Sequence, residues 1–130
     1  MQDLVVLGGG PAGAISALLA AREGLRVTLI DPDRGPDRLE GLSPRLHHWL
    51  HSQGLLLGFD GVIGPLSRQV NWAGISENNR EYVVQRGALD RHLRTQAVQA
   101  GAVLVRGSGC PVPGGAVLAG GSLLPARRVI

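Results

Sequence analysis

An apolar strand runs directly into a glycine-rich turn near the amino terminus of the chain. Residues 4–7 read Leu-Val-Val-Leu, and residues 8–13 read Gly-Gly-Gly-Pro-Ala-Gly, which is a G-x-G-x-x-G pattern. Residues 14–21 are strong helix formers. Spaced glycines between a strand and a helix are typical of the phosphate-binding turn of a dinucleotide-binding βαβ unit. The segment therefore predicts an α/β fold of the Rossmann type.

Each residue of this turn has a physical role in the prediction. Gly8 permits the tight turn off the strand, Gly10 lets a pyrophosphate approach the bare backbone, and Gly13 lets the helix pack close to the strand. Pro11 and Ala12 open the helix, where the missing N–H of proline costs nothing. The helix N-terminus offers unpaired N–H groups and a partial positive charge to phosphates. We predict that all five residues bind the cofactor.

A second apolar strand is predicted over residues 25–30, and it ends at Asp31. A carboxylate at this position can accept hydrogen bonds from the ribose of an adenosine. Its negative charge disfavours a 2′-phosphate, so FAD or NAD is favoured over NADP. Arg34 lies nearby, so NADP remains an alternative cofactor. The alternative is a glycine-rich βαβ unit that binds nothing.

The composition is that of an ordinary soluble domain. A chain of 130 residues is long enough for one domain with its own core. Its 13 basic residues are all arginines and are scattered, and the net charge is only +3, so we expect no nucleic-acid binding. The apolar runs are too short to span a membrane. The single cysteine, Cys110, cannot form an internal disulfide, which favours a cytoplasmic location.

The rest of the chain predicts two helices, one parallel strand and two antiparallel hairpins. Asp90 and Arg94, four residues apart on the second of these helices, are expected to form an ion pair on the surface. The predicted elements are a polar loop over 31–43, a helix over 44–53, a ribbon of strands 67–72 and 81–85 with a turn at Asn78–Asn79, a helix over 88–100, a strand over 102–105, a loop over 107–115, and a hairpin of 117–118 with 123–124.

Three histidines lie close together on the helix predicted over 44–53. His47 and His51 have the i, i+4 spacing that can hold a metal, and His48 lies beside them. Since no cysteine or acid is placed to complete a site, we predict an exposed polar helix face and no metal site.

Three segments together resemble a known family. They are the turn at 8–13 with Asp31, the segment Glu-Gly-Leu-Ser-Pro at 40–44, and the segment Val-Gln-Arg-Gly-Ala-Leu-Asp at 84–90. The chain is similar to the amino-terminal part of the FAD-dependent monooxygenase superfamily typified by p-hydroxybenzoate hydroxylase, in particular its tryptophan halogenase-like and geranylgeranyl reductase-like branch. The chain departs from the usual residues of this family at Asp31 for Glu, Gly41 for Ser and Leu89 for Phe.

The resemblance implies that FAD is the cofactor. It implies that Arg86 contacts the ribityl or pyrophosphate region of FAD, that Glu40 lies near the flavin, and that the backbone of residues 102–105 lies beside the adenine. None of the 130 residues stands out as catalytic. The family's halogenation route uses a lysine, which this chain lacks, so the known route of halogenation is disfavoured.

The resemblance also implies that residues 1–130 are the amino-terminal part of an FAD-binding domain, without a substrate domain. Ending at Val129–Ile130, inside an apolar strand, likewise suggests a truncated product that is inactive alone. We expect the FAD-binding portion of a flavin-dependent oxidoreductase. A monooxygenase acting on a small molecule or a peptide or protein side chain is favoured, with NAD(P)H or a separate flavin reductase as reductant. The alternatives are a non-catalytic nucleotide-binding fragment and the NAD-binding domain of a dehydrogenase.

Overall fold

The computed structural model describes residues 1–35 and 37–130, and these form two compact units. The first unit comprises Met1–Gly35 and Asp90–Ile130, and the second comprises the described residues from 37 to Leu89. The predicted loop over 31–43 includes Pro36, which lies outside the described residues. None of the helices in the described ranges combines the length and the apolar character that crossing a bilayer requires.

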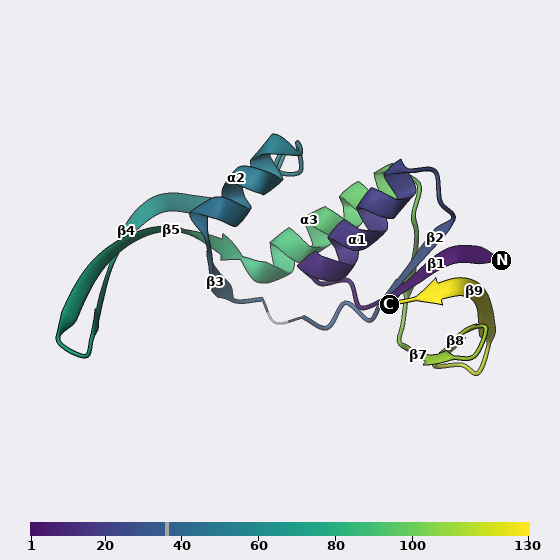
Figure 1. Ribbon diagram of the computed structural model, residues 1–130. Helices are drawn as coiled ribbons and strands as arrows, with labels where there is room; N and C mark the ends of the chain where they lie inside the picture. Colours follow the sequence, from purple (N-terminus) through teal and green to yellow (C-terminus); the bar gives the residue numbers. More distant parts are fainter. Residues whose placement is uncertain (36) are drawn as a thin grey trace. The chain divides into compact units, whose positions relative to one another are not determined.

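The first unit is built on a six-stranded sheet with the strand order β6-β2-β1-β9-β8-β7 (Figure 1). Strands β6, β2, β1 and β9 are mutually parallel, whereas β7, β8 and β9 form an antiparallel meander. This sheet confirms the predicted α/β fold of the Rossmann type. Its elements are β1 (Gln2–Leu7), α1 (Pro11–Arg22), β2 (Val27–Asp31), β6 (Val103–Arg106), β7 (Gly109–Val112), β8 (Gly115–Leu118) and β9 (Leu123–Val129).

The central strands and α1 owe their positions to apolar and small side chains. In β2, the four residues 27–30 are all buried, as expected for a parallel strand covered on both faces. The buried side of α1 consists of Ala14, Ala17, Leu18 and Ala21, and alanines allow a close approach to the sheet. The core cluster of the sheet consists of Val5, Ile30, Ala116 and Ala126.

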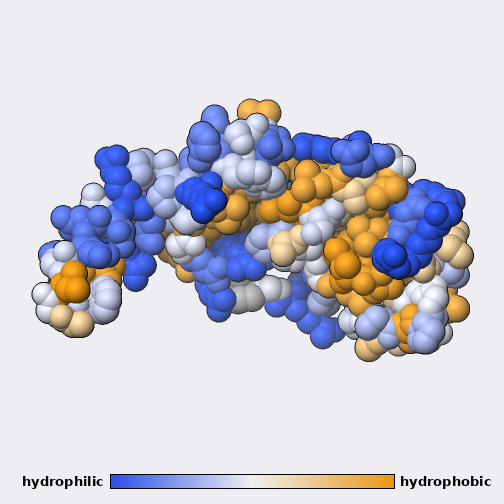
Figure 2. Space-filling view, in the orientation of Figure 1, coloured by the Kyte–Doolittle hydropathy of each residue, from blue (hydrophilic) through white to orange (hydrophobic). Residues whose placement is uncertain are grey.

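The second unit contains a three-stranded antiparallel sheet with the order β3-β5-β4 and one helix. Helix α3 (Arg86–Gln99) begins in this unit and continues into the first. The remaining elements are β3 (Leu39–Leu42), α2 (Pro44–Ser52), β4 (Val62–Trp72) and β5 (Ile75–Gln85). Figure 2 shows an orange, apolar spot at the tip of the β4–β5 ribbon, where Ile75 is 49% exposed.

The predicted antiparallel ribbon is confirmed, but its predicted turn is wrong. Asn78 and Asn79 lie inside β5, paired with Gln69 and Arg68 of β4. The chain turns at residues 73–74 instead, where φ is +48° and +76°. Two successive positive φ angles are typical of the tight hairpin turns whose twist matches paired strands. Asparagine favours turns in isolation, but the long pairing of the two strands outweighs that local preference.

Two predicted loops also contain strands. Within 31–43, β3 pairs with β5, and Leu42 lies opposite Tyr82 with its side chain buried. Within 107–115, β7 pairs with β8, and Pro111 is accommodated because β7 lies at the edge of the sheet. Both strands are short and polar or rich in turn residues, so they depend on pairing with β5 and with the neighbouring β8. The predicted hairpin is confirmed, since Val117 pairs with Leu123.

Candidate functional site

The glycine turn begins where β1 leaves the sheet. Gly8 has φ +102°, a left-handed conformation that glycine adopts without strain. The Leu7 N–H donates to the Ile130 carbonyl at 2.7 Å, and the Gly8 N–H donates to the Ile30 carbonyl at 2.8 Å. The strands on both sides of β1 therefore fix the entry to the turn.

Two glycines of the turn have no room for a side chain. A Cβ added at Gly13 would overlap the Gly8 carbonyl oxygen, so α1 packs against the turn as closely as the sequence predicts. A Cβ added at Gly9 would lie 2.6 Å from Cδ of Arg94 and 2.9 Å from Cβ of Asp31. The sequence pattern gives no role to Gly9, because it is a variable position of the G-x-G-x-x-G motif. Its buried neighbours show why glycine is required there.

The amino-terminal end of α1 is suited to an anion. Gly10 is the N-cap residue with an extended backbone, Pro11 is the first helical residue, and the Ala14 N–H donates to the Gly10 carbonyl at 2.9 Å. Among the described residues, no side chain caps this end and no acid lies in its first turn. The first N–H groups of a helix lack intrahelical partners. Those of Ala12 and Gly13 can therefore bind a phosphate.

Asp31, the last residue of β2, is tied to the glycine turn. Its Oδ1 accepts a hydrogen bond from the Gly9 N–H at 2.7 Å, and its Oδ2 accepts one from the Asp33 N–H at 2.7 Å. The guanidinium of Arg94 lies 3.4 Å from Oδ2. A carboxylate oxygen can accept more than one hydrogen bond, so both oxygens retain capacity for ribose hydroxyls.

Arg94 of α3 is a site residue that the sequence does not predict. The prediction that Asp90 and Arg94 lie on the surface is wrong, because these two residues are buried and only 8% and 7% exposed. Arg94 Nη1 donates to the Gly9 carbonyl at 2.8 Å, and Nη2 lies 2.6 Å from Asp33 Oδ1. Helical spacing indicates which residues share a face, but not which distant segment that face packs against.

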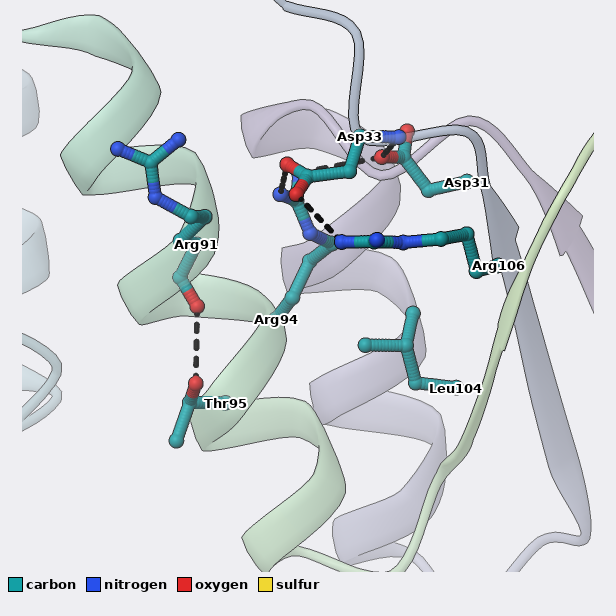
Figure 3. A pocket seen from close by; sticks show the side chains of 7 residues that line it. All are labelled: Asp31, Asp33, Arg91, Arg94, Thr95, Leu104 and Arg106. Atoms are coloured by element: carbon teal, nitrogen blue, oxygen red, sulfur yellow. Dashed lines mark hydrogen bonds and ion pairs between the residues drawn. The ribbon is translucent and has the colours of Figure 1, made fainter.

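These side chains border a cavity of about 240 Å³ (Figure 3). Sites that enclose a drug-sized ligand occupy roughly 300–1,000 Å³, so this cavity suits one part of a dinucleotide rather than the whole. Arg106, the last residue of β6, pairs with Asp33 at 2.8 Å. The carboxylate of Asp31, the cavity and the uncapped helix end together fit an adenine dinucleotide. The lining residues are Asp31, Asp33, Arg91, Arg94, Thr95, Leu104 and Arg106.

Glu40 and Arg86, the other two predicted site residues, form an ion pair in the second unit. Arg86 Nη1 lies 2.7 Å from Glu40 Oε2, and Arg38 Nε donates to Oε1 at 2.7 Å. The hydrogen bonds from Arg86 and then from Arg38 lower the pKa of Glu40 below its ordinary value, because they stabilise the charged carboxylate. The structure thus joins two residues that lie 46 positions apart in the sequence.

The histidines of α2 differ in their surroundings. His48 and His51 are exposed, as predicted, whereas His47 is half-buried and stacks on Tyr82 with ring centroids 3.7 Å apart. Burial lowers the pKa of His47, and the charges of His51 and His48 lower it further. Within residues 1–35 and 37–130, no cluster of three or more potential metal ligands is present.

The comparisons with known proteins agree with this geometry. Residues 3–35 match the sequence model of the FAD dependent oxidoreductase family. The chain is 34% identical over 123 residues to a menaquinone reductase of Mycobacterium tuberculosis, covering 82% of this chain and 29% of that protein. It is 35% identical over 115 residues to a digeranylgeranylglycerophospholipid reductase of Picrophilus torridus, covering 77% of this chain and 28% of that protein.

A solved structure is similar over almost the whole chain. It is a peptidyl tryptophan dihydroxylase essential for tryptophylquinone cofactor biogenesis, with a TM-score of 0.79 and 34% identity, and the match covers 98% of this chain and 31% of that one. The chain spans less than a third of the length of these relatives. The chain is similar to part of these FAD-dependent oxidoreductases, and its cofactor is FAD.

Proposed function

We propose that the glycine turn holds the diphosphate of FAD and that Asp31 holds the adenosine ribose. The uncapped N–H groups of Ala12 and Gly13 supply donors for the phosphates, and the backbones of Gly8, Gly10 and Pro11 line the approach. Asp31 supports this assignment because it is 14% exposed and borders the cavity. Its hydrogen bond from the Gly9 N–H ties the ribose acceptor directly to the phosphate turn.

Arg86 is proposed to contact the ribityl or pyrophosphate region of FAD, with Glu40 as its orienting partner. A guanidinium presents several fixed donors to phosphate and hydroxyl oxygens. The ionised Glu40 restrains the Arg86 side chain, since they are 2.7 Å apart and the pKa of Glu40 is lowered. The Arg86 side chain is 31% exposed, so part of it remains accessible to a ligand.

The whole protein is proposed to be a flavin monooxygenase that acts on a peptide or protein side chain or on a small molecule. The 34% identity to the peptidyl tryptophan dihydroxylase supports this reaction class. FAD supplies the redox chemistry when bound, and the protein supplies binding and orientation. NAD(P)H or a separate flavin reductase is the proposed reductant. The exposed, single Cys110 is consistent with a cytoplasmic location.

Reduction of a prenyl double bond is the second candidate function. It is favoured by the identity of 34–35% to a menaquinone reductase and a digeranylgeranylglycerophospholipid reductase. Labelled dioxygen separates the two candidates. A monooxygenase supplied with a tryptophan-containing peptide transfers labelled oxygen to the product. A reductase supplied with menaquinone instead yields a product in which a prenyl double bond is reduced and which carries no label.

Titration of the purified chain with FAD and with NAD tests the cofactor assignment. We expect FAD to bind more tightly than NAD, with the visible absorbance of the flavin retained after desalting. The variants Asp31→Asn and Arg86→Met should each weaken FAD binding about tenfold, as expected for loss of a charged hydrogen bond. The control Arg80→Met removes an exposed charge of β5 and should leave the affinity unchanged. A colourless chain that takes up neither ligand would indicate a non-catalytic module, and preference for NAD would indicate a dehydrogenase domain.

A further inference from the structure

Arg94 connects the three groups that surround the proposed ribose site. Its guanidinium donates to the Gly9 carbonyl at 2.8 Å, lies 2.6 Å from Asp33 Oδ1, and lies 3.4 Å from Asp31 Oδ2. These partners belong to the glycine turn, to the loop after β2 and to the end of β2. Figure 3 shows Arg94 reaching from α3 to Asp33 beside Asp31. One side chain therefore ties α3 to both parts of the cofactor site.

Burying the Arg94 guanidinium destabilises the fold unless its charge is paired and its N–H donors are hydrogen-bonded. Its side chain is 8% exposed, and a buried cation is tolerated only when it is paired and hydrogen-bonded. The guanidinium has five N–H donors in a rigid, planar fork, so it can serve a carbonyl and two carboxylates together. A lysine ammonium is a point charge without this fork, and it cannot hold the same three groups in one geometry.

The charges of Asp31 and Asp33 explain what Arg94 does for the site. Asp31 ends β2 and Asp33 lies two positions after it, and the Arg94 guanidinium contacts both carboxylates and the Gly9 carbonyl. Without Arg94 the two carboxylates repel each other more strongly, and the Asp31 carboxylate is restrained only by its hydrogen bonds from the Gly9 and Asp33 N–H groups. Asp33 keeps a second partner, Arg106, at 2.8 Å, whereas the described ion pair of Asp31 is with Arg94.

We propose that Arg94 is a positioning residue that holds the Asp31 carboxylate in the orientation that recognises the 2′-hydroxyl of the adenosine ribose. This inference rests on the proposed function, in which Asp31 accepts the ribose. Arg94 acts through Asp31 and Gly9 rather than by contact with the flavin. Its removal therefore changes the selectivity for the sugar, which a role in folding alone would not alter.

Calorimetric titration of the chain with ADP and with 2′-deoxy-ADP measures this selectivity. The unchanged chain should bind ADP about tenfold more tightly than 2′-deoxy-ADP, as expected for one hydrogen bond to a charged acceptor. In Arg94→Met and Arg94→Lys, the ratio of the two dissociation constants should fall toward one. The control is Arg80→Met, which removes the same charge from an exposed position of β5 and should keep the ratio. Circular dichroism confirms that each variant is folded.

The outcomes separate the inference from the proposed function. If the unchanged chain binds neither FAD nor ADP, the proposed function is wrong and the inference is wrong with it. If the unchanged chain binds both but does not distinguish the two sugars, or if folded Arg94→Lys keeps the full ratio, only the inference is overturned. Arg94→Lys retains the positive charge, so it provides the test even if Arg94→Met does not fold.

Discussion

At the scale of single residues, the glycines of this chain differ in what an added side chain would meet. An added Cβ at Gly13 would overlap the backbone oxygen of Gly8, which cannot move without displacing the end of β1. At the exposed Gly120, an added Cβ would meet no heavy atom within 4 Å. The same substitution is thus expected to have opposite consequences at the two positions.

Gly13→Ala should lower the free energy of unfolding by about 3 kcal/mol, since overpacking against rigid backbone is not relieved by side-chain movement. Denaturation in urea measures this loss. The control Gly120→Ala should change the free energy of unfolding by less than about 0.5 kcal/mol. Equal stability of the two variants would show that α1 can withdraw from the turn without cost.

His47 makes the stability of the chain depend on pH. Its pKa is lowered from the ordinary value of 6.5, chiefly because it is partly buried, so the unfolded chain takes up the proton more readily than the folded chain. The stability contributed by neutral His47 is complete above pH 6.5 and is lost as the pH falls toward the lower pKa of the folded state. His47→Phe keeps a ring against Tyr82 and should remove this part of the pH dependence. Unfolding curves of both proteins between about pH 5 and 7 provide the measurement, and parallel curves would contradict the prediction.

At the scale of elements, α2 was predictable because its signals are local. Ser43 precedes Pro44 in the sequence, and in the structure the Ser43 Oγ accepts a hydrogen bond from the Leu46 N–H at 3.1 Å. The helix ends at Ser52, one residue before the predicted end. By contrast, β3 and β7 have weak local signals and exist because β5 and β8 pair with them.

Replacing the cap of α2 tests how much this local signal contributes. Ser43→Ala should destabilise the chain by about 1 kcal/mol, because the Leu46 N–H loses its acceptor at the helix end. Ser67→Ala, on an exposed position of β4, is the control and should cost less than about 0.5 kcal/mol. Urea denaturation followed by helical circular dichroism distinguishes the two. A negligible effect of Ser43→Ala would show that tertiary packing alone holds α2.

At the scale of the whole molecule, the last strand supports the first turn. Strand β9 runs parallel to β1, the Leu7 N–H donates to the Ile130 carbonyl, and Ala126 is 6% exposed in the core cluster with Val5 and Ile30. The geometry of residues 7–8 therefore depends on residues near position 130. This dependence links stability at the carboxyl end of the chain to the turn that is proposed to bind the cofactor.

Ala126→Asp should destabilise the chain by about 3–5 kcal/mol, since it buries a charge without a partner. It should also abolish FAD binding, because β9 no longer pairs with β1 and the glycine turn that follows β1 loses its support. The control Arg128→Gln changes an exposed residue of the same strand and should leave both properties near those of the unchanged chain. FAD titration and thermal denaturation measure the two effects. Retention of FAD affinity by Ala126→Asp would show that the turn is independent of β9.

The sequence by itself determined the βαβ unit, the glycine turn and the acid at the end of β2. Their signals involve residues close together in the sequence. These signals are a run of apolar residues, glycines at a fixed spacing that steric crowding requires, and a helix that follows directly. Asp31 and Gly13 could be singled out because the motif relates them to their neighbours along the chain.

Only the tertiary structure decided what surrounds these residues. Arg94 meets the Gly9 carbonyl 85 positions away, Glu40 meets Arg86 across 46 positions, and β9 pairs with β1 across the length of the chain. Such contacts depend on how sheets and helices pack, and the sequence of one segment does not indicate which distant segment packs against it. A buried arginine and an exposed one look the same in a helical repeat, and their environments differ only once the chain has folded.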